Sequence, residues 1–348
     1  MLLWLLVLGK LFGASAAQQY TVTATRLTVN PLLSRYNSAF NWTYASALYT
    51  GVDGRIYILV RCENTTAAAP YEINYGQLAT SVFTNSQFTS ATALTPANVS
   101  LSPTNAAERC GVQDPRVAYF NGTYFAFFTA WGCPGTYYTL ALATSLDPRN
   151  ASGWTRITDN IFSGANRIHY SKSGAPLFRS VPPHYLFWGD GTGGFGISVA
   201  TSLDGLEWKN VQTNFIDTRA EGFDSAVIEA GPPPLPLSDG NYLMIYNSAR
   251  RGFPSVKPGF DLQYNMGYAI LEGENPASIL ARSGVTQPLF SPVLPWEVGN
   301  ATDPLSLTPN VVFCDGMVPF PGETDSFLFV YGAADSAVGV GKITVTKA

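Results

Sequence analysis

A carboxylate and a guanidinium lie two residues apart in the segment GVQDPRV, and this pair is the first candidate for chemistry in the sequence. Asp114 and Arg116 would project to the same face of an extended strand, because side chains alternate across a strand. Such a carboxylate can act as a general acid while the arginine orients a hydroxyl-rich ligand. A structural Asp–Arg pair fits the same spacing, so the pattern alone leaves both interpretations open.

Other charged residues stand at the starts or ends of β-rich runs. Glu229 comes just before residues 231–234 (GPPP), whose prolines suit an inner strand that needs few N–H groups for a ladder. Arg61 ends the apolar run IYILV, and Glu297 follows a Pro-Trp pair in a proline-rich loop. Simple exposure at a loop or strand end is the alternative for each. Further polar candidates beside such runs are Arg167, Lys172 and Asp335.

Common nucleophile, phosphate-binding and metal-binding signatures are absent from the sequence. There is no G-x-S-x-G elbow, no P-loop, no H-E-x-x-H and no C-x-x-C motif. The chain has only 2 histidines, which gives little support to a His-based triad or a zinc site. We therefore predict no metal and no cofactor, and we expect carboxylates, a few cations and aromatic side chains to form the site.

An internal repeat defines the elements that must position these residues. The tetrapeptide L/V-A-T-S recurs at 78–81, 142–145 and 199–202. An aromatic-rich run after a turn occurs five times, anchored at Tyr57, Tyr124, Tyr185, Tyr242 and Phe327. Each unit holds several short β-rich runs without helical periodicity, which is typical of a propeller blade. The sequence therefore predicts an all-β, five-bladed β-propeller whose inner strands converge on a channel; a two-sheet sandwich is the alternative.

The composition excludes several classes of protein. The 348 residues carry a formal net charge of -4, with 13% charged and 46% hydrophobic residues. Disordered chains combine low hydrophobicity with high net charge, and this chain has neither property. The slightly acidic balance, without a Lys/Arg run, also disfavours binding to nucleic acid.

The first 17 residues have the pattern of a secretory signal peptide. The apolar stretch MLLWLLVLGKLFG is followed by the small residues ASAA, which fits cleavage near residue 16 or 17. The stretch is shorter than the ~20 residues that span a bilayer. We therefore predict a signal peptide at 1–17, a single propeller domain at 18–348, and a secreted, extracellular protein with no membrane span. An uncleaved anchor or a buried N-terminal segment is the alternative.

Sequons and cysteines agree with an oxidising, secretory route. The Asn121-Gly122 pair predicts a two-residue hairpin turn. In an unbroken hairpin Cys110 and Cys133 would lie opposite each other, at a separation compatible with a disulfide, whereas a bulge would spoil this register. Cys62 and Cys314 are expected to be free and buried. The predicted N-glycosylation sites are Asn41, Asn64, Asn98, Asn121, Asn150 and Asn300.

Taken together, these motifs resemble glycoside hydrolase family 130, the β-mannoside phosphorylases and β-mannosidases, which are five-bladed β-propellers. The family motifs occur in the same order from about Asp53 to the C-terminus. The matching segments are residues 113–116 (E-D-P-R in the family), 231–234 (G-P-P-P), 246–248 (Y-H-G), 310–314 (N-V-V-F and Cys) and 331–335 (Y-G-A-A-D).

The resemblance implies that Asp114 is the catalytic acid of an inverting mechanism. The residues that it places around the sugar and acceptor are Arg61, Arg116, Lys172 and Asp335. Three positions depart from the family pattern. Gln113 replaces a glutamate, Ser173 replaces an aspartate, and Asn247 replaces the histidine that helps to bind phosphate in the phosphorylases.

The missing histidine favours a hydrolase over a phosphorylase. Arg167 and Lys172 could still hold an anion, with Asn247 among the substrate-binding residues, but a hydrolase needs a carboxylate that deprotonates water. Such a base lies ~6.5–9.5 Å from the acid in inverting enzymes, and Glu229 and Glu297 are the candidates. We therefore predict inverting hydrolysis of an oligosaccharide or polysaccharide of β-mannosides or a related glycan. A catalytically inactive carbohydrate-binding propeller, a mannoside phosphorylase and an arabinan-type glycosidase are the alternatives.

Overall fold

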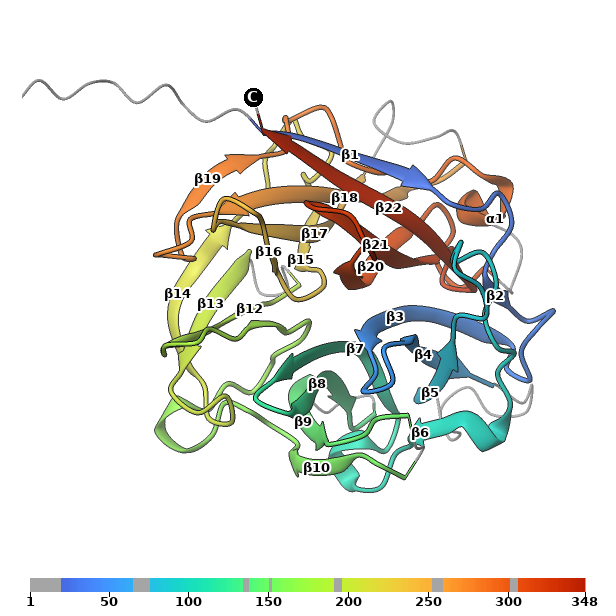
Figure 1. The fold of residues 1–348 in the computed structure, drawn as a ribbon, viewed down its shortest axis with the longest axis horizontal. Helices are drawn as coiled ribbons and strands as arrows, with labels where there is room; N and C mark the ends of the chain where they lie inside the picture. Colours follow the sequence, from blue (N-terminus) through green and yellow to red (C-terminus); the bar gives the residue numbers. More distant parts are fainter. Residues whose placement is uncertain are drawn as a thin grey trace, which may run out of the picture.

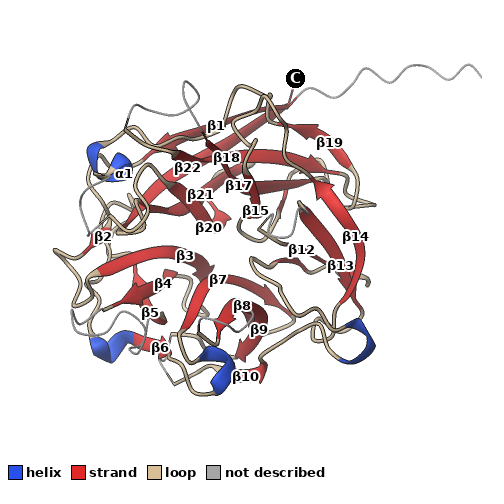
Figure 2. Ribbon diagram, turned by 180° about the vertical axis from the view of Figure 1, so that it is seen from behind, coloured by secondary structure: helices blue, strands red, loops and turns tan. Residues whose placement is uncertain are grey.

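The computed structural model describes residues 20–64, 76–133, 138–149, 152–190, 196–251, 259–300 and 306–347. These segments form five antiparallel sheets, which surround a common axis as the blades of a propeller (Figure 1). The view from behind shows the same ring of sheets (Figure 2). The predicted five-bladed β-propeller is confirmed. The predicted signal peptide at 1–17 and the sequon at Asn150 lie outside the described residues.

The first three blades are meanders of four strands, which follow one another from the innermost strand outward. Blade 1 consists of β3 (Trp42–Thr50), β4 (Ile56–Glu63), β5 (Gln77–Val82) and β6 (Val99–Leu101). Blade 2 consists of β7 (Gly111–Phe120), β8 (Thr123–Trp131), β9 (Tyr138–Ser145) and β10 (Thr155–Thr158). Blade 3 consists of β11 (Ala175–Leu177), β12 (His184–Trp188), β13 (Ile197–Ser202) and β14 (Lys209–Ile216).

The last two blades contain an additional short strand each. Blade 4 consists of β15 (Val227–Ala230), β16 (Leu235–Pro236), β17 (Tyr242–Arg251), β18 (Leu262–Leu271) and β19 (Ile279–Arg282). Blade 5 consists of β20 (Val312–Pro319), β21 (Ser326–Ala333), β22 (Ala337–Lys347), β1 (Tyr20–Arg26) and β2 (Leu33–Ser34). The helices within the described ranges are short: η1 (Pro96–Asn98), η2 (Ala106–Glu108), η3 (Gly164–Asn166) and α1 (Pro295–Val298).

The proline run of blade 4 interrupts its inner strand. β15 and β16 both pair with β17, so they are two halves of one strand, separated by residues 231–234. Proline cannot donate a ladder hydrogen bond, which explains the gap at this point. The sequence repeats also occupy equivalent places. The three copies of L/V-A-T-S lie in β5, β9 and β13, and the five aromatic anchors lie at or next to the start of the second strand of each blade.

The hydrophobic core is divided among the blade interfaces. Among the described residues, one cluster of buried apolar side chains lies between each two neighbouring blades. Leu48 and Val330 belong to the cluster between blades 1 and 5, and Leu59 and Phe128 to the cluster between blades 1 and 2. The burial of apolar side chains between the blades fixes the positions of the blades around the ring. The ends of the inner strands lie outside these clusters and carry polar residues.

The two ends of the described chain close the ring. β1 pairs antiparallel with β22 from Tyr20 opposite Lys347 to Arg26 opposite Gly341, so blade 5 combines strands from both ends. Figure 1 shows β1 lying along β22 at the edge of the sheet. No helix within the described residues is both long and apolar enough to cross a membrane.

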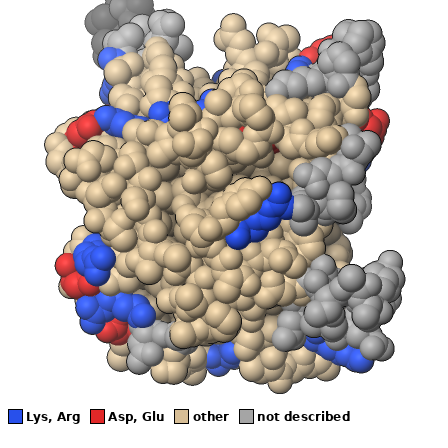
Figure 3. Space-filling view, turned by 90° about the vertical axis from the view of Figure 1, so that its right-hand side faces the viewer, with Lys and Arg blue, Asp and Glu red and all other residues tan. Residues whose placement is uncertain are grey.

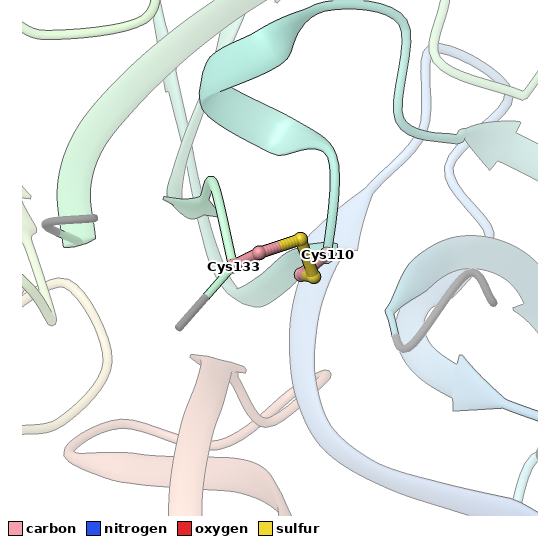
Figure 4. Close-up of a disulfide and its surroundings, with 2 residues drawn as sticks. All are labelled: Cys110 and Cys133. Atoms are coloured by element: carbon pink, nitrogen blue, oxygen red, sulfur yellow. A yellow bond between two sulfur atoms is a disulfide. The ribbon is translucent and has the colours of Figure 1, made fainter. Parts of the chain in front are cut away.

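The disulfide between Cys110 and Cys133 is present, but not for the predicted reason (Figure 4). The hairpin turns at Asn121-Gly122, where both residues have positive φ, as predicted. A bulge between Gln113 and Arg116 then shifts the register by one residue, so the hairpin is not unbroken. The two cysteines still come together, with Cα atoms 4.8 Å apart, because Cys133 leaves the strand with a φ of 95°.

We expect the double variant Cys110→Ser/Cys133→Ser to lose about 3 kcal/mol of unfolding free energy, because the disulfide closes a loop with a sequence separation of 23 residues. Urea denaturation of the variant and of the wild type, each with and without reductant, measures this loss. Reductant should destabilise the wild type alone. Equal midpoints for all four samples would contradict the prediction. Cys62 and Cys314 are buried and free, as expected, so they should not replace the missing bond.

Candidate active site

A pocket opens at the end of the channel where the inner strands of the blades begin. Every blade contributes to it, because the first residues of each inner strand reach the same end of the ring. Its walls combine carboxylates, cations and aromatic rings. The lining residues are Tyr44, Ala45, Arg61, Asp114, Lys172, Glu229, Tyr264, Thr308, Val311, Phe313 and Asp335.

Asp114 lies between two cations in this pocket. One carboxylate oxygen, Oδ1, is 2.7 Å from Nη1 of Arg61, and Oδ2 is 3.5 Å from Nζ of Lys172. The backbone of Asp114 has a φ of 48°, and the β7–β8 register shifts at this point. A bulge of this kind re-aims a side chain that a regular strand would point elsewhere. The strained backbone therefore turns the carboxylate toward the cations of blades 1 and 3.

Lys172 connects Asp114 with Glu229. Its Nζ is also 3.7 Å from Oε1 of Glu229, so the two carboxylate oxygens lie no more than about 7 Å apart. The hydroxyl of Ser173 donates a hydrogen bond to the same Oε1. An aspartate in place of Ser173 would instead set a second negative charge against Glu229. The departure from the family's Lys-Asp pair is thus matched by a direct contact with the glutamate.

Glu63 supports the site through Arg61, although it was not among the residues predicted from the sequence. It accepts hydrogen bonds from Nε of Arg61 at 2.7 Å and from the hydroxyl of Tyr44 at 2.7 Å. The Tyr44 ring also stacks under the guanidinium of Arg61, 4.6 Å from its carbon. Glu63 lies two residues after Arg61 on β4, so the alternation that suggested the pair at 114 and 116 was available here too. These contacts fix the guanidinium that faces Asp114.

The environments of the pocket carboxylates push their pKa values apart. Burial alone would raise the pKa of Asp114, but the charges of Arg61, Lys172 and Arg116 outweigh it and hold that pKa well below its usual range. Burial raises the pKa of Glu229, and Lys172 offsets part of this effect. Burial also raises the pKa of Asp335 to about 6, against a lowering by Thr308 and Arg61. In the free protein Asp114 is therefore the firmly ionised carboxylate.

Asp335 should make the stability of the protein depend on pH. Its pKa rises from 3.8 in the unfolded chain to about 6 in the folded one, so the folded state binds more protons between these values. Stability contributed by this group is then lost as pH rises through that window. We expect Asp335→Asn to gain melting temperature relative to the wild type between about pH 4 and pH 7. Melting curves of both proteins across this range test this, and a constant difference would contradict it.

Arg116, which was predicted to bind substrate, is not among the lining residues of the pocket. Its side chain is fully buried, and Nη2 is 2.6 Å from Oδ1 of Asp315. The guanidinium also donates to the backbone oxygens of Asp114, Ala230 and Gly231. The bulge at residue 114 breaks the alternation from which a shared face was expected. Arg116 therefore joins blades 2, 4 and 5; it holds the backbone of Asp114 by a hydrogen bond and acts on the Asp114 carboxylate through charge.

Asn247 does not line the pocket either. It is fully buried on β17, where its Nδ2 donates to the backbone oxygen of Cys314 and its Oδ1 accepts from the backbone nitrogen of Cys314. A side-chain amide carries the donor and the acceptor that this double contact needs. In the structure the polar atoms of Asn247 link blade 4 to blade 5, and the predicted contact with substrate stays a prediction.

Glu297, which was predicted as a possible catalytic base, does not line the pocket. The carboxylate is fully buried behind α1 and binds Nε and Nη2 of Arg26 at 2.6 and 2.7 Å, together with the hydroxyl of Tyr331. The backbone nitrogens of residues 293 and 294 donate to it as well. Glu297 thus links α1 to β1 and β21 of blade 5, and it does not lie where a catalytic base would act. Arg167 is exposed just after η3 and is not among the lining residues.

The structure therefore brings Asp114, Glu229, Arg61, Lys172 and Asp335 together and leaves the other four predicted residues outside the pocket. Glycosidic bonds are cleaved by a carboxylate that can exchange a proton, together with a second carboxylate nearby and cations beside both. Within the described residues, no group of three or more His, Cys, Asp or Glu side chains is arranged to hold a metal ion. The site and fold define a class of carbohydrate-active propellers.

The comparison with known proteins makes this class more specific. The family model of glycoside hydrolase family 130, described as β-1,4-mannooligosaccharide phosphorylase, matches residues 17–348. The chain therefore belongs to this family, whose members act on β-mannosidic linkages.

Individual relatives are distant but cover much of the chain. A β-1,2-mannobiose phosphorylase of Thermoanaerobacter sp. (strain X514) is 26% identical over 241 residues, which is 69% of this chain and 69% of the relative. A 1,2-β-oligomannan phosphorylase of the same organism is 26% identical and covers 66% and 67%. A solved structure from the GH130 family of mannoside phosphorylases, which contains glycoside hydrolases that target β-1,2-mannosidic linkages in Candida mannan, has a TM-score of 0.72 at 22% identity and covers 95% of both chains.

Proposed function

We propose that the protein cleaves β-mannosidic linkages of oligosaccharides in the pocket around Asp114 and transfers the mannosyl group to phosphate. The observation that carries the proposal is the position of Asp114 between Arg61 and Lys172. Membership of the family and the phosphorylase activity of the two curated relatives support the choice of phosphate. This choice departs from the hydrolysis predicted from the sequence.

The charges of the pocket suggest how the reaction proceeds. Cleavage breaks the bond between the anomeric carbon and the leaving oxygen, forms a bond from that carbon to a phosphate oxygen, and delivers one proton to the leaving oxygen. In the free protein the cations keep Asp114 ionised. A phosphate bound beside Lys172 would add negative charge and raise the pKa of Asp114. Asp114 could then carry the proton that the leaving oxygen needs, so phosphate would supply both the nucleophile and the condition for acid catalysis.

Hydrolysis is the second candidate, and the carboxylates favour it. The pocket contains three carboxylates, Asp114, Glu229 and Asp335, but two cations, Arg61 and Lys172, among its described lining residues. An excess of negative charge opposes the binding of a phosphate dianion. The two Lys172 contacts place one Glu229 oxygen no more than about 7 Å from one Asp114 oxygen, and this limit reaches the short end of the ~6.5–9.5 Å separation that leaves room for a water molecule. In this alternative Glu229 would deprotonate that water.

A product assay separates the two reactions. The protein is incubated with β-1,2- and β-1,4-linked manno-oligosaccharides, with and without phosphate, and free mannose is separated from mannose 1-phosphate. The proposal expects mannose 1-phosphate that forms only with phosphate present. Free mannose that forms equally without phosphate would establish hydrolysis instead. If neither product forms from either series of oligosaccharides, the proposed function is overturned.

Secretion is a further part of the proposal, supported by the sequence of residues 1–17 and by the surface position of the sequons. Asn41, Asn64, Asn121 and Asn300 are exposed, whereas Asn98 is partly buried and accepts hydrogen bonds from Thr95. We expect the expressed full-length chain to reach the culture medium of a eukaryotic host without its first residues. Intact mass before and after removal of N-glycans tests both points, and an unprocessed chain retained in the cells would contradict them.

A further inference from the structure

A second hollow lies on the rim of the propeller between blades 5 and 1. It is formed by β2 and the loop that follows it, by α1, and by the turn between β21 and β22. Both ribbon views place α1 and β2 near each other at the edge of the ring (Figures 1 and 2). We call this hollow the rim groove; its lining includes Arg35, Tyr36, Asn41, Trp296, Ser306 and Ser336.

The rim groove lies next to the catalytic pocket. Three separate segments contribute to both hollows within a few residues. Asn41 lines the groove and Tyr44 the pocket; Ser306 lines the groove and Thr308 the pocket. Ser336 and its neighbour Asp335 divide in the same way. A chain molecule whose end occupies the pocket can therefore continue into the groove over one side of the ring.

The chemistry of the groove suits sugar rings. Tyr36 is 83% exposed, and the guanidinium of Arg35 packs over one face of its ring at 4.9 Å. Nη2 of Arg35 also donates to the Tyr36 hydroxyl at 2.9 Å, so the exposed ring is held by two contacts. Trp296 is stacked on Tyr331 and bonded through Nε1 to the backbone oxygen of Val29. Fixed aromatic rings bind apolar faces with little loss of entropy.

Polar groups of the groove can meet the hydroxyls of such a ligand. Asn41, Ser306 and Ser336 supply an amide and two hydroxyls, which donate and accept hydrogen bonds. On the side of the molecule seen in Figure 3, separate patches of Lys and Arg side chains lie on a surface that is otherwise largely uncharged. Arg35 is the one charged residue among the described lining residues of the groove, and the uncharged remainder suits a neutral, hydroxyl-rich ligand.

We propose that the rim groove binds the sugar units of an oligosaccharide that extend beyond the catalytic pocket. The protein should therefore prefer chains longer than a disaccharide, and Tyr36 should set this preference. The inference rests on the proposed function, because the pocket must hold the reacting end of the same chain. Two predicted glycosylation sites, Asn41 and Asn300, line the groove, so the groove is open to a ligand only when these two asparagines carry no glycan. The test therefore uses protein from a host that does not attach N-glycans.

The variant Tyr36→Ala tests the groove through chain length. The value of kcat/KM is measured for mannotetraose and for mannobiose of whichever linkage series the wild type cleaves. We expect the tetraose-to-biose ratio to fall about fivefold, which corresponds to one lost stacking contact. Tyr119→Ala is the matched control, because Tyr119 is also exposed but lies at the opposite end of the channel. That variant should keep the wild-type ratio.

The outcomes separate the groove from the proposed function. An unchanged ratio in Tyr36→Ala overturns the groove and leaves the cleavage reaction intact. When the wild type cleaves neither series, the proposed function fails, and calorimetric titration with β-1,2- and β-1,4-mannotetraose then tests the groove directly. Binding that is at least severalfold weaker in Tyr36→Ala than in Tyr119→Ala would support it. The absence of binding to the wild type would overturn it.

Discussion

Asp114→Asn will lower the turnover of β-mannoside cleavage by a factor on the order of 10² to 10⁴, because a positioned acid contributes about that much. The amide preserves the shape of the side chain but cannot deliver a proton to the leaving oxygen. The substitution also removes the charge that occupies Arg61 and Lys172 in the free protein. We therefore expect the KM for phosphate to fall or stay constant while kcat falls. Initial rates at varied phosphate and saturating oligosaccharide measure both values.

The control for this experiment is Asp147→Asn in the same blade. Asp147 is paired with Arg149 in a surface turn after β9, away from the pocket. It should retain the wild-type kcat and melting temperature, whereas Asp114→Asn should melt below the wild type, because it loses a buried carboxylate whose pKa the folded state lowers. A kcat within tenfold of the wild type in Asp114→Asn would exclude the acid role. A raised KM for phosphate with unchanged kcat would instead make Asp114 a binding residue only.

The fold was readable from the sequence because each blade repeats the same local pattern. The tetrapeptide L/V-A-T-S occupies the third strand of blades 1 to 3, and the aromatic anchors open the second strands. A repeated unit that cannot bury its apolar faces alone must stack against its neighbours. The five interface clusters are the physical result of that requirement. The three prolines of blade 4 were expected to form part of its inner strand, and in the structure they interrupt it.

The orientation of side chains within the site was harder to predict. Alternation places residues 114 and 116 on one face only in a regular strand, and the bulge at Asp114 separates them. Pro115 is a signal for this irregularity, since proline inside a strand favours a bulge. By contrast, Arg61 and Glu63 follow alternation on the regular strand β4 and meet as the rule predicts. The rule therefore held where the strand was regular.

Glu297 and Asn247 lie outside the pocket because they bind partners that are far apart from them in the sequence. Glu297 binds Arg26 across a separation of 271 residues, and Asn247 binds the backbone of Cys314 across 67 residues. Local sequence around Glu297 and Asn247 contains nothing that specifies these partners. Both contacts join neighbouring strands or blades around the ring, so they become visible only once the ring is closed. A polar residue near a motif can serve the framework as readily as the reaction.

Asp315→Asn will destabilise the protein by about 3–5 kcal/mol, the usual result of leaving one partner of a buried ion pair without its counter-charge. Both Arg116 and Asp315 are fully buried, 2.6 Å apart, where water cannot screen the guanidinium. Arg116 keeps its backbone acceptors in the variant, but they do not neutralise its charge. The midpoint of urea unfolding, followed by tryptophan fluorescence, measures the loss. Arg116 also donates to the backbone oxygen of Asp114, so we expect the position of Asp114 in the pocket to become less well fixed in the variant.

Two further variants show whether the lost charge pair is the cause. Asp261→Asn breaks the exposed pair of Arg251 and Asp261, with side chains 59% and 77% exposed, and should cost less than about 1 kcal/mol. The double variant Arg116→Met/Asp315→Leu removes both buried charges, so it should recover a large part of the stability that Asp315→Asn loses. Burial raises the pKa of Asp315 well above its usual range, against a lowering by Arg116, so a cost below about 1 kcal/mol for Asp315→Asn would contradict an ionised pair and would mean that the carboxyl is already protonated. The charged guanidinium would then lie beside a neutral carboxyl, and the depressed pKa of Asp114 would depend on Arg61, Lys172 and an uncompensated Arg116 together.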